Sequence, residues 1–309
     1  MQDKIKQLWR QIRNGDQKAL ARAITLVENE LPGYDDLLLQ LPETEKTNVI
    51  GITGPPGAGK STLVNALLHY WLNENKKIAV IAVDPSSPFN YGALLGDRIR
   101  MNEFYTNPNV FIRSLASRGA LGGLNSKIIE ITDVVKNAGY DLVLVETVGV
   151  GQSEIDIAGL ADCTIVTLVP EGGDVVQTLK AGIMEIANMF VVNKADRDEA
   201  NALYNNLRIL VHEKADGDKE IPVLKTIATS HTGIAELANE ITTYLEAGKT
   251  NERMAYLLAD KCWQLLQEKR MKNINRKVLQ AALAEALQQP GFNLYRFVQD
   301  FDAAQKSIR

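Results

Sequence analysis

A run of glycines followed by a lysine and two hydroxyl residues fits the phosphate-binding pattern G-x-x-x-x-G-K-[ST]. The run consists of Gly54, Pro55, Pro56, Gly57, Ala58, Gly59, Lys60, Ser61 and Thr62. It follows a strand-like segment and begins a helix-like one, the context that the pattern requires. Glycines let backbone N–H groups turn inward around phosphate oxygens, and a helix N-terminus adds partial positive charge. We expect Lys60 to contact the β- and γ-phosphates of a nucleotide and Ser61 to bind Mg²⁺.

A second motif, N-K-x-D, consists of Asn193, Lys194 and Asp196 and follows an apolar strand-like segment. The Asp196 carboxylate can accept hydrogen bonds from guanine N1–H and from the exocyclic amine. Adenine lacks this pair of donors and would leave the carboxylate unsatisfied. Asn193 would brace the loop, and the aliphatic part of Lys194 would lie along the base. The motif therefore predicts a guanine nucleotide.

Acidic residues end two further strand-like segments, Asp84 after Ile78–Val83 and Glu146 after Leu142–Val145. Carboxylates at such positions hold Mg²⁺ in P-loop nucleotidases. Ras-like proteins have Asp where this chain has Glu146. Asp97, which lies beside two arginines, is a candidate for a mobile metal ligand. We expect Lys60, Asp97 and Glu146 to act in catalysis, and Ser61, Asp84, Asp97 and Glu146 to form the metal site.

Two glycine-containing segments complete the candidate site. Arg113–Gly123 is polar and precedes a helix-like segment, which is typical of a mobile or nucleotide-sensing loop. Pro170–Gly182 follows a strand-like segment and has flanking glycines, which favours a hinged segment.

The elements that must position these motifs alternate along the chain. Apolar runs predict strands at 49–53, 78–84, 142–146, 164–169, 190–193 and 223–227, and helical spacing predicts helices at 60–73, 94–104, 124–138, 175–185, 198–213 and 233–247. Continuous apolar strands are buried on both faces of a parallel sheet. The sequence therefore predicts an α/β fold with a doubly wound, mostly parallel sheet.

The two ends of the chain lack this alternation. Residues 1–45 predict an N-terminal extension of two short helices, and residues 46–249 hold the strands and motifs. Residues 250–309 predict a helical arm with a break at Lys269–Asn275 and a final helix after Pro290-Gly291. We expect these three ranges to be the domains.

Composition narrows the class of protein. The 309 residues are 45% hydrophobic, enough for a sizeable core, and the net charge of −4 argues against a general binder of nucleic acid or anionic membranes. Cys163 and Cys262 form neither a disulfide framework nor a metal motif. There is no apolar leader or run of about 20 apolar residues. We expect a cytoplasmic protein with no nucleic-acid or membrane partner.

Together these segments resemble the MeaB/MMAA/ArgK-type G proteins of the SIMIBI class of P-loop GTPases. The resemblance spans most of residues 48–248. It is carried by the P-loop, N-K-A-D and four further motifs, V-D-P-S-S-P, L-G-D-R-I-R-M, S-R-G-A-L-G-G and E-T-V-G-V-G-Q-S-E.

The resemblance implies Mg²⁺-dependent hydrolysis of GTP to GDP and phosphate. It also implies a chaperone role, in which the protein gates adenosylcobalamin delivery from an adenosyltransferase and protects an acyl-CoA mutase such as methylmalonyl-CoA mutase. By resemblance, Glu146–Asp156 is switch II, and Lys180 in Pro170–Gly182 is a functional residue that moves on partner binding. The C-terminal arm would support a homodimer.

One segment departs from the family pattern. The family has S-A-x in the loop beside guanine, whereas this chain has Ile227, Ala228 and Thr229. Ala228 can still offer its backbone N–H to guanine O6, so we expect these three residues to line the nucleotide.

Three other functions fit parts of the pattern. A nickel-insertion metallochaperone GTPase would share the nucleotide motifs but usually carries a Cys/His metal motif. An ATP-dependent kinase would share the P-loop but not N-K-A-D. A regulatory module with negligible turnover would bind nucleotide only to set a conformation.

Overall fold

The computed structural model describes residues 2–41, 47–84, 101–117, 124–147, 155–171, 183–214, 221–248, 252–271, 274, 276–288 and 291–306. The chain divides into two compact units, Met1–Met254 and Ala255–Arg309. The first contains every strand of the described sheet and both nucleotide motifs.

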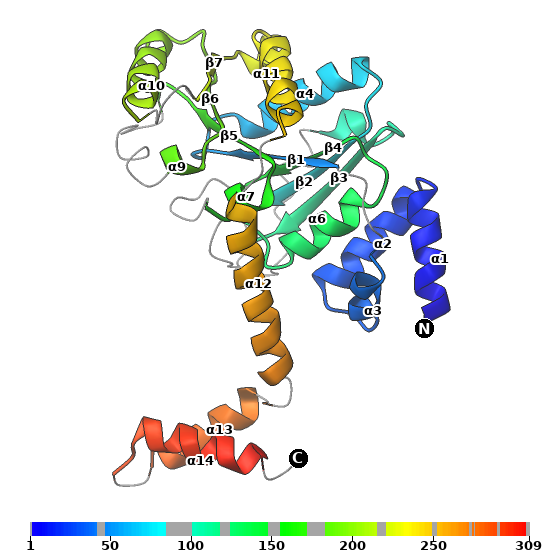
Figure 1. Ribbon diagram of the computed structural model, residues 1–309, viewed down its shortest axis with the longest axis vertical. Coiled ribbons are helices and arrows are strands. Elements are labelled where there is room, and N and C mark those ends of the chain that lie inside the picture. The colour runs from blue at the N-terminus through cyan, green and yellow to red at the C-terminus, as the bar shows by residue number, and fades with distance from the viewer. Residues whose placement is uncertain are drawn as a thin grey trace. The chain divides into compact units, whose positions relative to one another are not determined.

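A parallel sheet of seven strands forms the centre of the first unit (Figure 1). The strands are β1 (Asn48–Thr53), β2 (Ile78–Asp84), β3 (Val110–Ala116), β4 (Leu142–Glu146), β5 (Cys163–Leu168), β6 (Met189–Val192) and β7 (Val223–Lys225), in the order β3-β2-β4-β1-β5-β6-β7. The predicted α/β fold with a parallel sheet is confirmed, and every described pairing between these seven strands is parallel.

Helices cover both faces of this sheet, because successive strand residues point to opposite sides. On β5, Ile165 packs with residues of α4 (Lys60–Asn73) and α11 (Ile234–Glu246), whereas Val166 packs with residues of α10 (Ala200–Lys214). Burial on both faces explains why these strands are continuous apolar runs.

The strand β1 allows a close approach of α7 (Ile155–Leu160) at Gly51. A Cβ at Gly51 would lie 2.6 Å from Ile157 Cγ1, so a larger residue would push the helix away from the sheet. The α7 helix was absent from the predicted elements.

The strand β3 lies partly where the sequence predicted a loop. Arg113–Ala116, predicted to begin a mobile loop, forms the end of this strand and pairs with Ile81–Asp84 of β2. Its polar residue Arg113 is accommodated because it donates to Glu28 Oε2 at 2.7 Å and to Thr25 Oγ1 at 3.2 Å. Residues 118–123 of the predicted loop lie outside the described residues.

The N-terminal segment forms three helices rather than the predicted two. They are α1 (Gln2–Arg13), α2 (Gln17–Glu28) and α3 (Tyr34–Leu39). The third follows Gly33, whose φ of 99° is unfavourable for other residues, and Trp9 Nε1 donates to Leu37 O at 3.3 Å. Gln17 Nε2 donates to Pro108 O and Val110 O, which ties α2 to the start of β3.

One predicted helix is shorter than expected. The remaining short elements are η1 (Asn102–Phe104), α6 (Ile128–Lys136), α9 (Met184–Ile186) and η3 (Ala228–Ser230). The helix predicted at 124–138 starts later because Asn125 Oδ1 accepts from Lys127 N at 2.8 Å and forms a turn instead. Parts of the helices predicted at 94–104 and 175–185 fall outside the described residues.

The C-terminal unit consists of helices. They are α12 (Glu252–Met271), which begins just before the unit boundary, α13 (Arg276–Ala286) and α14 (Leu294–Lys306). The gap between α12 and α13 falls within the predicted break at Lys269–Asn275. In the described part of the chain, no helix has the length and apolar character needed to cross a membrane.

Candidate nucleotide-binding site

The P-loop, Gly54–Thr62, connects β1 to α4 at the carboxyl edge of the sheet. All three of its glycines have positive φ, at 138° for Gly54, 77° for Gly57 and 82° for Gly59. A Cβ at Gly54 would lie 2.0 Å from Thr167 O, and one at Gly59 would lie 2.5 Å from Asn193 Nδ2. The loop can therefore take this path only with glycine at both positions.

Lys60 occupies the first turn of α4 and is 6% exposed. Its Nζ donates to Gly54 O at 2.8 Å and to Pro55 O at 3.2 Å. The ammonium group is thus held directly over the loop by its own carbonyl groups. A bound phosphate would offer this charge a stronger acceptor than a neutral carbonyl.

Ser61 and Glu146 meet beside the P-loop. Ser61 Oγ donates to Glu146 Oε1 at 2.8 Å, and both side chains are buried. Because β4 lies between β1 and β2, Glu146 has Ile52 on one side and Ala82 on the other. Asp84, also buried, follows two residues after Ala82 at the same edge.

This edge fits a hard divalent cation. Hydroxyl and carboxylate oxygens from Ser61, Glu146 and Asp84 are the donor type that Mg²⁺ prefers. Over the described residues, no group of three or more His, Cys, Asp or Glu side chains is arranged to hold a metal. A magnesium ion here could bind Ser61 Oγ together with phosphate oxygens and water, as is usual for Mg²⁺ with nucleotides. Asp97, the predicted mobile ligand, lies outside the described residues.

Asn193 links three loops at the same edge of the sheet. It is 2% exposed, and its Nδ2 donates to Ala58 O of the P-loop at 3.0 Å. Its Oδ1 accepts from Thr226 Oγ1 at 3.1 Å and from Ala228 N at 3.3 Å. The prediction that Asn193 braces this region agrees with these contacts, and the P-loop proves to be one of its partners.

The remaining residues of the N-K-A-D motif are less buried than Asn193. Lys194 has a φ of 55°, and Ala195 N donates to Thr226 O at 3.0 Å. The Asp196 side chain is exposed. The segments Asn193–Asp196 and Thr226–Thr229, called here the base loops, are therefore joined by backbone and side-chain bonds, with the Asp196 carboxylate accessible to a ligand.

The second base loop is a tight turn. Ile227 N and Thr232 O are 3.0 Å apart in an antiparallel bridge, and His231 at its end has a φ of 57°. Ile227 is half-buried, Ala228 is buried and Thr229 is exposed. Gly233 follows, where a Cβ would lie 2.2 Å from Lys225 O.

Sequence reasoning missed two buried threonines at this site. Thr226 is fully buried, and its hydroxyl donates to Asn193 Oδ1. Thr53 Oγ1 lies 2.9 Å from the hydroxyl of Thr147, the residue after Glu146. The available signal was positional, because each threonine lies at or just beyond the carboxyl end of a strand.

His69 of α4 packs against η1 and against the turn that follows the second base loop. Its ring contacts that of Phe104, with centroids 4.9 Å apart, and that of His231, at 5.4 Å. Glu103 receives a 2.8 Å hydrogen bond from Asn65, and this bond, with a smaller contribution from the charge of His69, lowers the pKa of the Glu103 carboxyl. One helix thus begins at the P-loop and supports the other end of the site.

Several predicted residues fall outside the described part of the chain. They are Asp97, Lys180 and most of the segments Glu146–Asp156 and Pro170–Gly182. Their roles stay predictions. At the described end of the last segment, Glu171 forms an exposed ion pair with Arg197, which follows the N-K-A-D motif.

Comparison with known proteins supplies independent information. The family model described as "Methylmalonyl Co-A mutase-associated GTPase MeaB" matches residues 20–282. The chain is 40% identical over 256 residues to the GTPase ArgK of Escherichia coli, covering 79% of this chain and 77% of that protein. It is 39% identical over 210 residues to the mitochondrial methylmalonic aciduria type A homolog of Caenorhabditis elegans, covering 63% of this chain and 53% of that protein.

A solved structure has the same fold over nearly the whole chain. The crystal structure of a LAO/AO transport system kinase superposes with a TM-score of 0.68 and 27% sequence identity. The match covers 96% of this chain and 97% of the other. Both the sequence and the fold therefore have relatives that extend over most of the chain.

Proposed function

This chain belongs to the MeaB family and is a P-loop GTPase, and we propose that it uses GTP hydrolysis to act as a chaperone of an acyl-CoA mutase that requires adenosylcobalamin. The protein would gate delivery of the cofactor and protect the mutase from inactivation. The family description and the name of the C. elegans relative support this client. The single structural observation that carries the nucleotide part is Asn193, which joins the P-loop to both base loops.

We propose that the P-loop binds the triphosphate. Its backbone N–H groups, exposed by the left-handed glycines, would surround the phosphate oxygens. Lys60 would exchange its bonds to Gly54 O and Pro55 O for the β- and γ-phosphates. Because the ammonium group is already buried and oriented, little reorganisation would be needed when negative charge develops in the transition state.

Magnesium would bind beside Ser61, with Glu146 and Asp84 near it and Asp97 as a further candidate ligand. When bound, the ion would neutralise charge on the β- and γ-phosphates. Ser61 Oγ would turn its lone pair toward the ion, while Glu146 would keep the hydroxyl oriented through the bond now seen at 2.8 Å. Water would attack the γ-phosphorus in line, and the P-loop would stabilise the departing charge.

Guanine recognition would fall to the base loops. Asp196 would accept hydrogen bonds from N1–H and the exocyclic amine, and the aliphatic part of Lys194 would cover the base. Ala228 N now donates to Asn193 Oδ1 at a long 3.3 Å, and guanine O6 could share this donor. Ile227 and Thr229 would flank the base in place of the usual Ser-Ala-x sequence.

The C-terminal unit is proposed to support a homodimer. Its helices carry large apolar side chains that are exposed in the single chain, among them Tyr256, Trp263 and Tyr295 at 71%, 64% and 81%. Exposed aromatic and aliphatic residues of this density typically mark an interaction surface. Lys180, in the Pro170–Gly182 segment, is proposed to move when the client binds.

A hydrolysis assay with the client tests the whole proposal. GTP turnover would be measured with and without an adenosylcobalamin-dependent acyl-CoA mutase in its apo form, using Lys60→Ala as the inactive control. We expect the mutase to change the rate and to co-elute with the GTPase in gel filtration. An unchanged rate together with separate elution would remove the mutase from the proposal while leaving the GTPase activity in place.

A further inference from the structure

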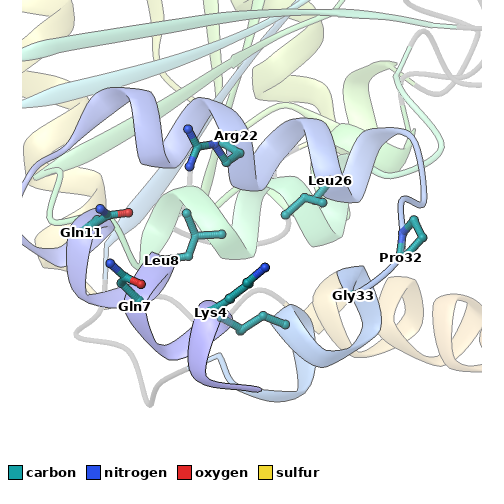
Figure 2. Close-up of a pocket in the computed structure, with 9 residues that line it drawn as sticks. Lys4, Gln7, Leu8, Gln11, Arg22, Leu26, Pro32 and Gly33 are labelled. Atoms are coloured by element: carbon teal, nitrogen blue, oxygen red, sulfur yellow. The ribbon is translucent and has the colours of Figure 1, made fainter. Parts of the chain in front are cut away.

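A pocket separate from the nucleotide site lies among the N-terminal helices (Figure 2). It is lined by residues of α1, α2 and the turn before α3, and its volume is about 440 Å³. Sites for small organic molecules typically range from about 300 to 1,000 Å³. The pocket is therefore large enough for a ligand, and none of its lining residues belongs to the P-loop or the base loops.

The helical spacing of α1 explains how the pocket is built. Lys4, Leu8 and Gln11 recur at intervals of four and three residues, so they share one face of the helix. On α2, Arg22 and Leu26 are four residues apart and face them across the gap, as Figure 2 shows. Buried Leu8 and half-buried Leu26 supply an apolar floor between the two helices.

The charged side chains that line the pocket are both basic. Lys4 and Arg22 are both exposed, and none of the described residues that line the pocket is Asp or Glu. In the part of the chain that the structure describes, neither cation forms an ion pair, whereas Arg113 and Lys127 nearby are paired with Glu28 and Glu30. The pocket therefore combines an apolar floor with two cations that form no ion pair among the described residues.

We propose that this pocket binds a small amphiphilic anion, an organic carboxylate or phosphate monoester with an aliphatic body. The acidic group would contact Lys4 and Arg22, and the guanidinium can hold a carboxylate or phosphate through two parallel hydrogen bonds. The aliphatic body would cover Leu8 and Leu26, and Gln11 would add a neutral hydrogen-bonding group. The long stems of both cations can lie along this floor while their charged ends stay at the rim.

The chemical class of the ligand follows from its two parts. A simple inorganic anion would leave the apolar floor in water, and a neutral alkyl compound would leave both cations unused. A dissolved molecule fits better than a membrane surface, because the apolar residues lie inside a concavity rather than on an outward face. The proposal does not depend on the identity of the client mutase.

Calorimetric titration of the full-length chain with three probes that share one alkyl chain tests the proposal. Octanoate and octyl phosphate carry the acidic group, and octanol does not. We expect at least one of the two anions to bind about tenfold or more tightly than octanol. Equal affinity for octanol and both anions, or no binding of either anion, would overturn the proposal.

A pair of charge-matched variants locates the site. Lys4→Gln with Arg22→Gln removes both pocket cations, and we expect it to weaken binding of the anion about tenfold or more. Lys6→Gln with Arg10→Gln removes two exposed cations of α1 that do not line the pocket, and we expect less than about a twofold change. GTP binding by both variants, which should equal that of the wild type, confirms that they are folded.

Two results would count against the assignment in this second experiment. Equal weakening by both double variants would indicate non-specific attraction by net charge. Capture of the wild-type chain on phosphatidylglycerol vesicles, with no binding of dissolved octanoate or octyl phosphate, would assign the two cations to a membrane surface instead.

Discussion

The P-loop and the base loops lie at the same edge of the sheet but are held in different ways. The P-loop takes its shape from glycines with positive φ, and it is closed by Lys60 bonding back to Gly54 and Pro55 a few residues earlier. The base loops are joined through Asn193 and Thr226, which are 33 residues apart. The two halves of the site therefore differ. The P-loop half is shaped by contacts within its own segment, whereas the base-loop half requires the sheet to be assembled first.

This difference has a consequence for specificity. In the proposed function, the P-loop would present backbone groups and one cation to the phosphates that GTP and ATP share. In that function, the base loops would present the Asp196 carboxylate to the base, the one part of the nucleotide that differs. Affinity should therefore depend mainly on the first half and selectivity on the second, with Asn193 connecting them through Ala58.

The largest effect is expected from Lys60→Ala. Removing the buried ammonium group should slow GTP hydrolysis by about 10²- to 10³-fold, the loss typical of one preorganised group that stabilises transition-state charge. Because the phosphates are common to both nucleotides, ATP binding should fall by the same factor as GTP binding. Single-turnover hydrolysis and nucleotide titration measure the two effects.

Lys76→Ala is the matched control, because Lys76 pairs on the surface with Glu74 at 3.4 Å. It should leave both measurements unchanged. If Lys60→Ala weakened the binding of GTP but not of ATP, the proposal that the P-loop determines affinity and the base loops determine selectivity would be wrong.

A smaller effect is expected from Asn193→Ala, which cuts the link between the halves. The variant leaves Ala58 O and Thr226 Oγ1 without their buried partner, so the free energy of unfolding should fall by about 1–3 kcal/mol. GTP affinity should fall more than ATP affinity, because the base loops lose their brace. Urea denaturation and competition titration provide the two measurements.

Asn201→Ala is the matched control, because it removes the same type of side chain from an exposed position. Among the described contacts, Asn201 accepts only an exposed hydrogen bond from Lys225. It should alter the free energy of unfolding by no more than about 0.5 kcal/mol. An Asn193→Ala protein as stable as this control would show that the link has no energetic role.

The smallest effect is expected from Asp133→Asn on α6, a helix outside both halves. Burial raises the pKa of the Asp133 carboxyl. The positive charge of Lys136 partly lowers this pKa, and the negative charge of Glu130 raises it further. The folded state therefore binds this proton more tightly than the unfolded state does, and stability is lost as the pH rises through the carboxyl's folded pKa.

Asp133→Asn removes this loss at neutral pH. The variant should be more stable than the wild type by about 0.5 kcal/mol at pH 7 and equal to it near pH 3, where both side chains are neutral. Thermal unfolding at the two pH values checks this. GTP hydrolysis should be unchanged, so a loss of activity would show that α6 influences one of the halves.

The locally determined half was also the half that could be predicted from sequence. The P-loop motif located Lys60 and Ser61 at the start of α4, shortly after β1, and apolar runs located six of the seven strands. The strand β3 was missed because Arg113 and Ser114 break its apolar pattern. Arg113 is tolerated there through its bonds to Glu28 and Thr25, more than 80 residues away.

The contacts of the base loops could not be predicted in the same way. The motif identified Asn193 and Asp196, but the bonds of Asn193 to Ala58 and Thr226 depend on the strand order β1-β5-β6-β7. The third N-terminal helix was missed for a similar reason. Its Leu37 is buried and its carbonyl group accepts from Trp9, a partner 28 residues earlier.

The preference for GTP over ATP in Asp196→Ala tests the central claim most directly. Competition between the two nucleotides for the wild type and for this variant gives the ratio of their affinities. The account predicts that the wild type strongly prefers GTP and that the variant loses this preference by about 100-fold or more, while its ATP affinity stays the same. An unchanged preference in the variant, or a wild type that binds neither nucleotide, would contradict it.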